Sequence, residues 1–214
     1  MGVVSEAGLM NSGAIDTMAL ATKKIRLTPE EYLEGEKSSD VKHEYDNGYV
    51  VAMVGASRAH NLIALTLAAA IRQHLKGSRC RTYMSDMKVR IRTDHNDLFY
   101  YPDVMVSCDD NPVSEYYEEK PILIVEVLSP TTEIRDKLEK LSAYSSIPSL
   151  KEYVTVAQDR VEVNRYSVVD GVASLTQYQE GDGVELASVG LTIPVKEIYA
   201  DVAEEAMKKG LFDD

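Results

Sequence analysis

The chain has 214 residues, of which 44% are apolar and 27% are charged, and its formal net charge is −12. The length favours one domain with a core large enough to fold without a metal or a disulfide. So negative a chain argues against broad electrostatic binding to nucleic acid, because such binding depends on Lys and Arg neutralising phosphates. No apolar run approaches the roughly 18 residues of a membrane helix, so we expect no membrane span.

The cysteine content and the N-terminal composition give two further expectations. Cys80 and Cys108 are the only cysteines, which argues against a disulfide framework and favours a reducing, cytoplasmic location. The first 24 residues lack Lys or Arg before Lys23 and resemble no secretion signal. We therefore predict a flexible N-terminal leader over residues 1–24 and a single domain over residues 25–214.

Capping and turn residues define the first predicted elements. Thr28, followed by proline and then by Glu31, has the spacing of a capping box and predicts a short helix. Asn47 and Gly48 stand between two apolar segments and predict a β-hairpin. Ser57 then caps a longer helix that ends at Gly77. The residues predicted to share its apolar face are Ile63, Leu67, Ala70 and Ile71.

The basic segment 72–92 has seven Lys or Arg residues and one acid, a local charge of +6. The segment "CRTYMSDMKVRIRTD" reads as one strand with an alternating second half. Its polar face presents Lys88, Arg90 and Arg92, which we interpret as possible DNA contacts. A solvated surface that balances an acidic chain is the alternative.

The second half of the chain predicts more strands and two more helices. "LFYYPDVMVSC" and "PILIVEVLSP" read as buried strands, and a helix near Thr132 to Ser145 follows them. The inner stripe predicted for that helix consists of Ile134, Leu138, Leu141 and Ser145. Two further strands pair across Gln158 and Asp159, and a last helix begins at Pro194. This order predicts an α/β fold with a mixed central β-sheet flanked by α-helices.

Glu126 is a single charge within the apolar strand "PILIVEVLSP". An isolated carboxylate in a dry strand is costly, so it needs a partner or a metal. Asp103 enters the strand of "YPDVMV" in a similar way, and neighbouring strands would bring the two acids together. Two carboxylates suit Mg²⁺ or Mn²⁺.

The predicted helix after Glu126 supplies a lysine. Asp136, Lys140 and Tyr144 recur every four residues and form one polar stripe. A lysine beside metal-bound carboxylates can orient or deprotonate a water, while the metal stabilises charge on a phosphate. We assign Asp136 and Tyr144 to orienting Lys140 or capping local structure.

Four segments, in this order, resemble the Uma-two family, which is classed among the restriction endonucleases of the PD-(D/E)XK superfamily. They are "HEYDNGYVVAM", "YPDVMV", "PILIVEVLSPTT" and "RDKLEKLSAYSSIPSLKEYVTV". The resemblance spans about residues 25–200. It implies a restriction-endonuclease-like fold and a divalent-metal nuclease site that acts on DNA. A homodimer is expected by analogy, because cutting two strands suits a two-fold assembly.

Site residues also follow from the resemblance. It implies that Asp103 and Glu126 are the two acids of the metal site. The backbone carbonyl of Val127 is then a further ligand, and Glu44 completes the site.

The superfamily lysine has a different position in this chain. The superfamily places it two positions after the second acid, where this chain has Leu128. In this branch the resemblance implies that Lys140 replaces it and positions the attacking water. Lys88 is a second possible donor.

Other interpretations stay open. Glu126 and Asp103 can form a buried ion pair with Lys140 or Lys137, and Glu44 can close a hairpin or pair with Lys42. His60 is more typical of a capping or packing residue than of a ligand. The whole fold can be a module that binds nucleic acid or a protein partner without cutting, which the net charge and Leu128 favour. A glycosidase with Asp103 and Glu126 as acid and base would need no metal.

Overall fold

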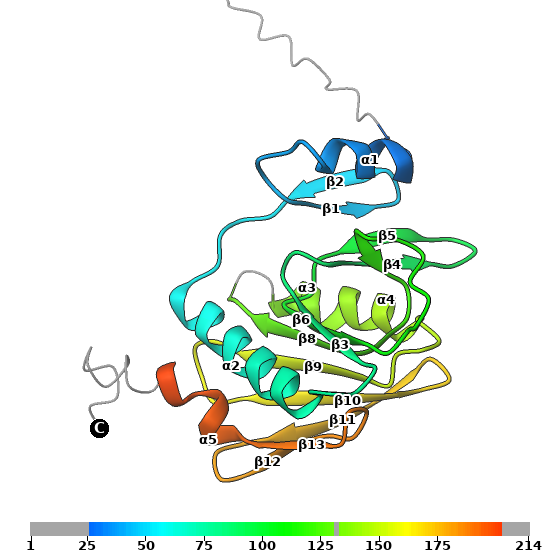
Figure 1. The fold of residues 1–214 in the computed structure, drawn as a ribbon. Helices are drawn as coiled ribbons and strands as arrows, with labels where there is room; N and C mark the ends of the chain where they lie inside the picture. The colour runs from blue at the N-terminus through cyan, green and yellow to red at the C-terminus, as the bar shows by residue number, and fades with distance from the viewer. Residues whose placement is uncertain (1–25, 131–132, 203–214) are drawn as a thin grey trace, which may run out of the picture.

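Two mixed β-sheets make up most of the computed structural model, which describes residues 26–130 and 133–202 (Figure 1). The five-stranded sheet has the order β2-β1-β5-β4-β7 and the six-stranded sheet the order β11-β10-β9-β8-β6-β3. Most neighbours are antiparallel, but β4 with β7 and β8 with β9 are parallel. The predicted mixed α/β class is confirmed. The predicted leader, residues 1–24, lies outside the described residues, and the single-domain boundary stays a prediction.

The strands have the following bounds. The five-stranded sheet contains β1 (His43–Asp46), β2 (Tyr49–Ala52), β4 (Lys88–Arg92), β5 (Asp97–Tyr100) and β7 (Tyr117–Glu118). The six-stranded sheet contains β3 (Arg81–Met84), β6 (Val104–Ser107), β8 (Pro121–Leu128), β9 (Glu152–Ala157), β10 (Val163–Val169) and β11 (Val172–Tyr178). A small antiparallel pair contains β12 (Gly183–Leu186) and β13 (Leu191–Pro194).

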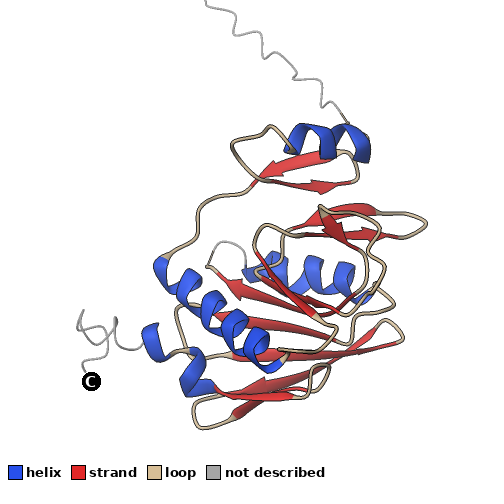
Figure 2. Cartoon of the chain, in the orientation of Figure 1, coloured by secondary structure: helices blue, strands red, loops and turns tan. Residues whose placement is uncertain are grey.

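Helices cover both faces of the six-stranded sheet (Figure 2). The described helices are α1 (Pro29–Glu36), which lies beside β1 of the five-stranded sheet, α2 (Arg58–His74), α3 (Glu133–Arg135), the π-helical η1 (Asp136–Lys140), α4 (Leu141–Ser145) and α5 (Val195–Ile198). The buried side of α2 packs on one face of β6 and β8, through Val125 and Val127 among others. The other face, which carries Met105 and Ile124, packs against α4. Because strand side chains alternate, Glu126 points to the face that carries Ile124.

The predicted N-terminal elements are confirmed, except that α2 ends at His74 and not at Gly77. Thr28 and Glu31 form the capping box of α1 in both directions. The hairpin β1–β2 turns at Asn47 and Gly48, whose φ angles of 49° and 98° are the left-handed values that such a two-residue turn requires. Ser57 caps α2 by accepting a hydrogen bond from the backbone N–H of His60.

Two segments predicted as single strands are each divided between the two sheets. "CRTYMSDMKVRIRTD" forms β3 and β4, and "LFYYPDVMVSC" forms β5 and β6. The first break lies at Ser85, whose φ of 36° turns the chain out of the six-stranded sheet. Local alternation shows which face a residue occupies, but it does not show which sheet its strand joins. The predicted polar face is also wrong at Lys88, which is buried.

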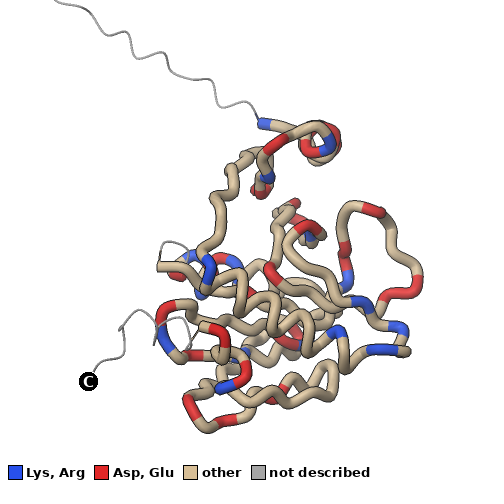
Figure 3. The backbone as a smooth tube through the Cα atoms, turned by 60° about the vertical axis from the view of Figure 1, so that its left-hand side comes forward, with Lys and Arg blue, Asp and Glu red and all other residues tan. Residues whose placement is uncertain are grey.

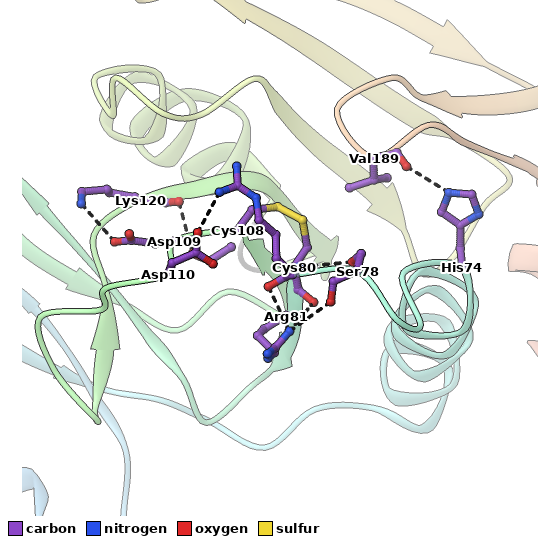
Figure 4. The surroundings of a disulfide bond; sticks show 11 residues. His74, Ser78, Cys80, Arg81, Cys108, Asp109, Asp110, Lys120 and Val189 are labelled. Carbon is purple, nitrogen blue, oxygen red and sulfur yellow. Dashed lines mark hydrogen bonds and ion pairs between the residues drawn. A yellow bond between two sulfur atoms is a disulfide. The ribbon is translucent and has the colours of Figure 1, made fainter.

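Cys80 and Cys108 form a disulfide, contrary to the expectation from cysteine count (Figure 4). The antiparallel pairing of β3 with β6 places Arg81 opposite Ser107, so the flanking cysteines meet across the edge of the sheet. A cross-link between residues 28 positions apart lowers the entropy of the unfolded chain, which stabilises the folded state by about 3–4 kcal/mol. Disulfides are rare in reducing compartments, so cysteine usage no longer supports a cytoplasmic location.

No helix within residues 26–130 and 133–202 is long and apolar enough to cross a membrane.

Candidate functional site

Two adjacent strands bring Asp103 and Glu126 to one part of the six-stranded sheet. β6 and β8 are antiparallel neighbours, with Val104 opposite Val125. Asp103 immediately precedes β6, and its Oδ2 accepts a 2.7 Å hydrogen bond from the backbone N–H of Val127. The two strands are therefore neighbours, as the convergence of the two acids requires.

Glu126 is buried beneath the helical segment that follows it in the chain. Its Oε1 accepts hydrogen bonds from Lys140 Nζ at 2.9 Å and from the Tyr144 hydroxyl at 2.7 Å. Burial raises the pKa of Glu126 to about 8; Lys140 opposes this rise, and the charges of Asp103 and Asp136 add to it. The raised pKa of Glu126 therefore reflects chiefly the removal of its carboxylate from water.

Lys140 lies at the centre of three buried carboxylates. Its Nζ is 2.9 Å from Glu126 Oε1, 3.2 Å from Glu44 Oε1 and 3.4 Å from Asp136 Oδ1. Burial lowers the pKa of Lys140, but the three acids outweigh it and hold the pKa above its usual value. The side chain is therefore a charged hydrogen-bond donor that can orient a water but is poorly suited to deprotonate one.

At the start of the helical segment that contains Lys140, the buried face is opposite to the predicted one. Ile134 and Leu138, predicted to face inward, are 77% and 66% exposed, whereas all three members of the polar stripe are buried. The π-helical segment η1 changes the phase of the helix, and π-bulges are frequent at functional sites. Ser145 is buried and Leu141 is partly buried, so the predicted stripe holds only toward the C-terminal end.

Glu44 enters the same cluster from the five-stranded sheet. Its Oε2 accepts a 2.6 Å hydrogen bond from Arg135 Nη1, while its Oε1 faces Lys140. Lys42, the alternative partner considered for Glu44, instead pairs with Asp86. Arg135 was not anticipated, because a single arginine on a short helix gives no signal of which strand it faces.

His60 also belongs to the cluster, through the first turn of α2. Its Nε2 lies 3.2 Å from Asp103 Oδ2, and both side chains are largely buried. Burial lowers the pKa of His60, but the hydrogen bond and the charge of Asp103 outweigh burial and raise the pKa above its usual value. The interpretation as a capping or packing residue missed this contact. Its only sequence signal is the position three residues after the Ser57 cap.

Charge is unbalanced in this cluster. Lys140 contacts Glu44, Glu126 and Asp136, and Arg135 contacts Glu44, whereas Asp103 contacts His60. When all four acids are ionised and His60 is neutral, two negative charges are uncompensated, which is the charge of one divalent cation. Carboxylate oxygens are also the ligands that Mg²⁺ and Mn²⁺ prefer.

The side chains are not arranged as a ready coordination sphere. Within the described part of the chain, no three His, Cys, Asp or Glu groups are placed as a metal cluster. Instead, Lys140 lies between three of the acids. The donor set therefore fits a divalent cation in ligand type and charge. Holding one requires the acids to move away from Lys140.

The predicted DNA-contacting residues do not form one basic face. Lys88 is buried, and its Nζ lies 5.0 Å from the centre of the Tyr101 ring. Arg90 pairs with Asp97 at 2.7 Å, and exposed Arg92 lies 3.8 Å from Glu119. Figure 3 shows the same mixing of acidic and basic positions along the described part of the backbone. Of the two candidate lysines, Lys140 contacts Glu126, whereas the contacts of Lys88 lie elsewhere.

The protein has the restriction-endonuclease-like fold. Its mixed sheet carries acids on adjacent strands, and the following helix supplies a lysine. A solved structure from Anabaena variabilis, described as "a putative nuclease belonging to DUF820", has the same fold. It matches with a TM-score of 0.64 over 81% of this chain and 98% of its own, at 17% identity.

The chain belongs to the Uma2 family. The family model, described as "Putative restriction endonuclease", matches residues 29–196. Two Synechocystis proteins are also similar. The uncharacterized protein slr1290 is 38% identical over 83% of this chain and 94% of its own length, and the uncharacterized protein sll1609 is 31% identical over 79% and 96%.

Proposed function

We propose that the protein is a metal-dependent endonuclease that hydrolyses phosphodiester bonds in DNA with Mg²⁺ or Mn²⁺. The observation that carries the proposal is the cluster of four carboxylates, in which Glu44, Glu126 and Asp136 are buried around Lys140 and Asp103 lies beside His60. With all four acids ionised and His60 neutral, a divalent cation would restore neutrality there. Membership in a family described as restriction endonucleases supports the same reaction class.

Each residue of the cluster has a role in the proposal. Asp103 and Glu126 would hold the cation, with Glu44 and the carbonyl of Val127 as further ligands. The cation, when bound, supplies stabilisation of charge on the phosphate and a more acidic water. Lys140 donates to the attacking water and holds it in line with the phosphorus.

Plasmid cleavage tests the proposal. We expect the purified protein to nick or linearise supercoiled DNA with Mg²⁺ or Mn²⁺ but not with EDTA. Asp103→Asn should lower the rate by roughly 10²–10³-fold, because it removes a charged ligand of the cation that stabilises the phosphate. Asp109→Asn is the matched control, since Asp109 lies just beyond β6 and pairs with Lys120 at 3.0 Å. Cutting that survives Asp103→Asn would contradict the site assignment.

A second candidate is a nuclease-fold module that binds nucleic acid or a protein partner without cutting. The engagement of Lys140 by three carboxylates favours it, because a lysine so held has little freedom to meet a water. Metal binding without cleavage of any DNA would support this module. EDTA-resistant hydrolysis of a glycoside would instead favour the glycosidase interpretation.

We also propose that the protein acts in the cytoplasm as a homodimer. Two sites related by a two-fold axis would cut both strands in one encounter. Direct conversion of supercoiled plasmid to linear DNA, without accumulation of the nicked form, would support the dimer.

A further inference from the structure

Lys88 is a buried lysine with no ionic partner. It is 7% exposed, and within residues 26–130 and 133–202 no carboxylate lies within 4.0 Å of its Nζ. Its ammonium group lies over the Tyr101 ring, whose centre is 5.0 Å away. Burial lowers the pKa of Lys88; Glu36 opposes this, and Lys42 adds to it. An unpaired buried ammonium is costly unless an anion joins it.

Lys42 approaches the same ring. Its Nζ lies 5.8 Å from the centre of Tyr101, so two ammonium groups share one aromatic side chain. Lys42 is 43% exposed and pairs with Asp86, which is 83% exposed. Exposed ion pairs contribute little to stability, so Asp86 can give way to another anion. An anion from solvent can therefore contact exposed Lys42 first and then reach the buried ammonium group of Lys88.

Short segments of the chain connect Lys42, and the Tyr101 ring beneath Lys88, to residues of the proposed metal centre. Lys42 is two residues before Glu44, and Tyr101 is two residues before Asp103. Two residues span at most about 7 Å, which is comparable to the separation of adjacent phosphates along one strand. In addition, the backbone N–H of Ser85, whose carbonyl accepts from Lys42, donates to the carbonyl of Asp103.

We propose that Lys42 and Lys88 bind the backbone phosphate next to the one that is cut, and so position the DNA strand at the metal centre. This inference rests on the proposed endonuclease function. A lysine ammonium is a compact point charge that suits phosphate oxygens. The bound phosphate supplies the anion that Lys88 lacks and displaces Asp86 from Lys42.

Binding of a fluorescent DNA oligonucleotide in EDTA tests the inference without requiring cleavage. Lys88→Met should weaken binding about tenfold, and Lys42→Met should do so to a smaller extent. The double variant should lower the slope of log affinity against log salt by about one, because one phosphate contact is lost. Lys76→Met is the matched control, since Lys76 is an exposed lysine of the same basic segment. Asp86→Asn should strengthen binding.

Unchanged affinity and salt slope in both lysine variants would overturn the inference. So would variants that bind DNA normally but lose binding of inorganic phosphate, because the pair would then be a free-phosphate site only. If Lys88→Met fails to fold, Lys42→Met and Asp86→Asn still test the inference. Both positions are substantially exposed, so we expect these variants to fold. If the lysine variants bind DNA more weakly as expected but the unaltered protein cuts no DNA, the phosphate subsite is supported and the endonuclease function is rejected.

Discussion

Glu126→Gln is expected to abolish metal-dependent cleavage while the protein stays folded. Glutamine has the same shape and its carbonyl oxygen can still accept from Lys140 and Tyr144, so the packing around residue 126 survives. The loss of the negative charge removes one ligand for the cation, and we expect the cleavage rate to fall by roughly 10²–10³-fold. Plasmid cleavage under saturating Mg²⁺ measures the effect.

The same variant has an expected effect on pH dependence. In the metal-free protein, the pKa of Glu126 rises from its usual 4.5 to about 8, so the folded state binds more protons than the unfolded state in that window. The stability of the unaltered protein therefore falls as pH rises from about 5 to about 8. Glu126→Gln removes the titrating group and should flatten this part of the profile.

Glu118→Gln is the matched control for both measurements, because Glu118 is equally buried but lies on β7, outside the cluster. Its cleavage rate should equal that of the unaltered protein. If Glu126→Gln and Glu118→Gln cut DNA equally well, Glu126 has no part in the reaction.

Lys140→Met is expected to destabilise the metal-free protein strongly. It removes the cation that lies between Glu44, Glu126 and Asp136, and leaves buried carboxylates without compensation. Removing one partner from a buried ion network costs about 3–5 kcal/mol. Added Mg²⁺ should recover part of this loss, because a ligand that binds only the folded state stabilises it. Urea unfolding with and without Mg²⁺ measures both effects.

Lys137→Met provides the comparison for that variant. Lys137 is one turn away on the same helical segment, is partly exposed, and pairs with Glu133 and Glu162. Its loss should cost about 1 kcal/mol or less and should not respond to Mg²⁺. Equal unfolding midpoints for the two variants would show that Lys140 does not hold the cluster together.

Sequence patterns were sufficient to predict the structure where the interactions that determine it are local. The capping box of Thr28 and Glu31 and the turn at Asn47 and Gly48 depend on residues within four positions of each other. The pairing of the strands that carry Asp103 and Glu126 followed from a physical requirement, because a buried acid needs neighbours. Family resemblance then selected Lys140, which does contact Glu126.

The remaining features depend on contacts between distant parts of the chain. The division of residues 80–94 between two sheets, and the resulting disulfide of Cys80 and Cys108, depend on which strand each segment meets. Apolar periodicity placed Ile134 and Leu138 inward, yet the buried ion network holds the polar stripe there instead. The contact of His60 with Asp103 joins helix α2 to strand β6, and no local pattern indicates it.

Direct measurement of Mn²⁺ binding tests the central claim, that Asp103 and Glu126 hold a divalent cation. Titration of the purified protein with Mn²⁺, with free Mn²⁺ followed by its paramagnetic resonance signal, gives the affinity without requiring turnover. We predict saturable binding by the unaltered protein and at least roughly tenfold weaker binding by Asp103→Asn and Glu126→Gln. Equal binding by all three proteins, or no binding by the unaltered protein, would contradict the claim.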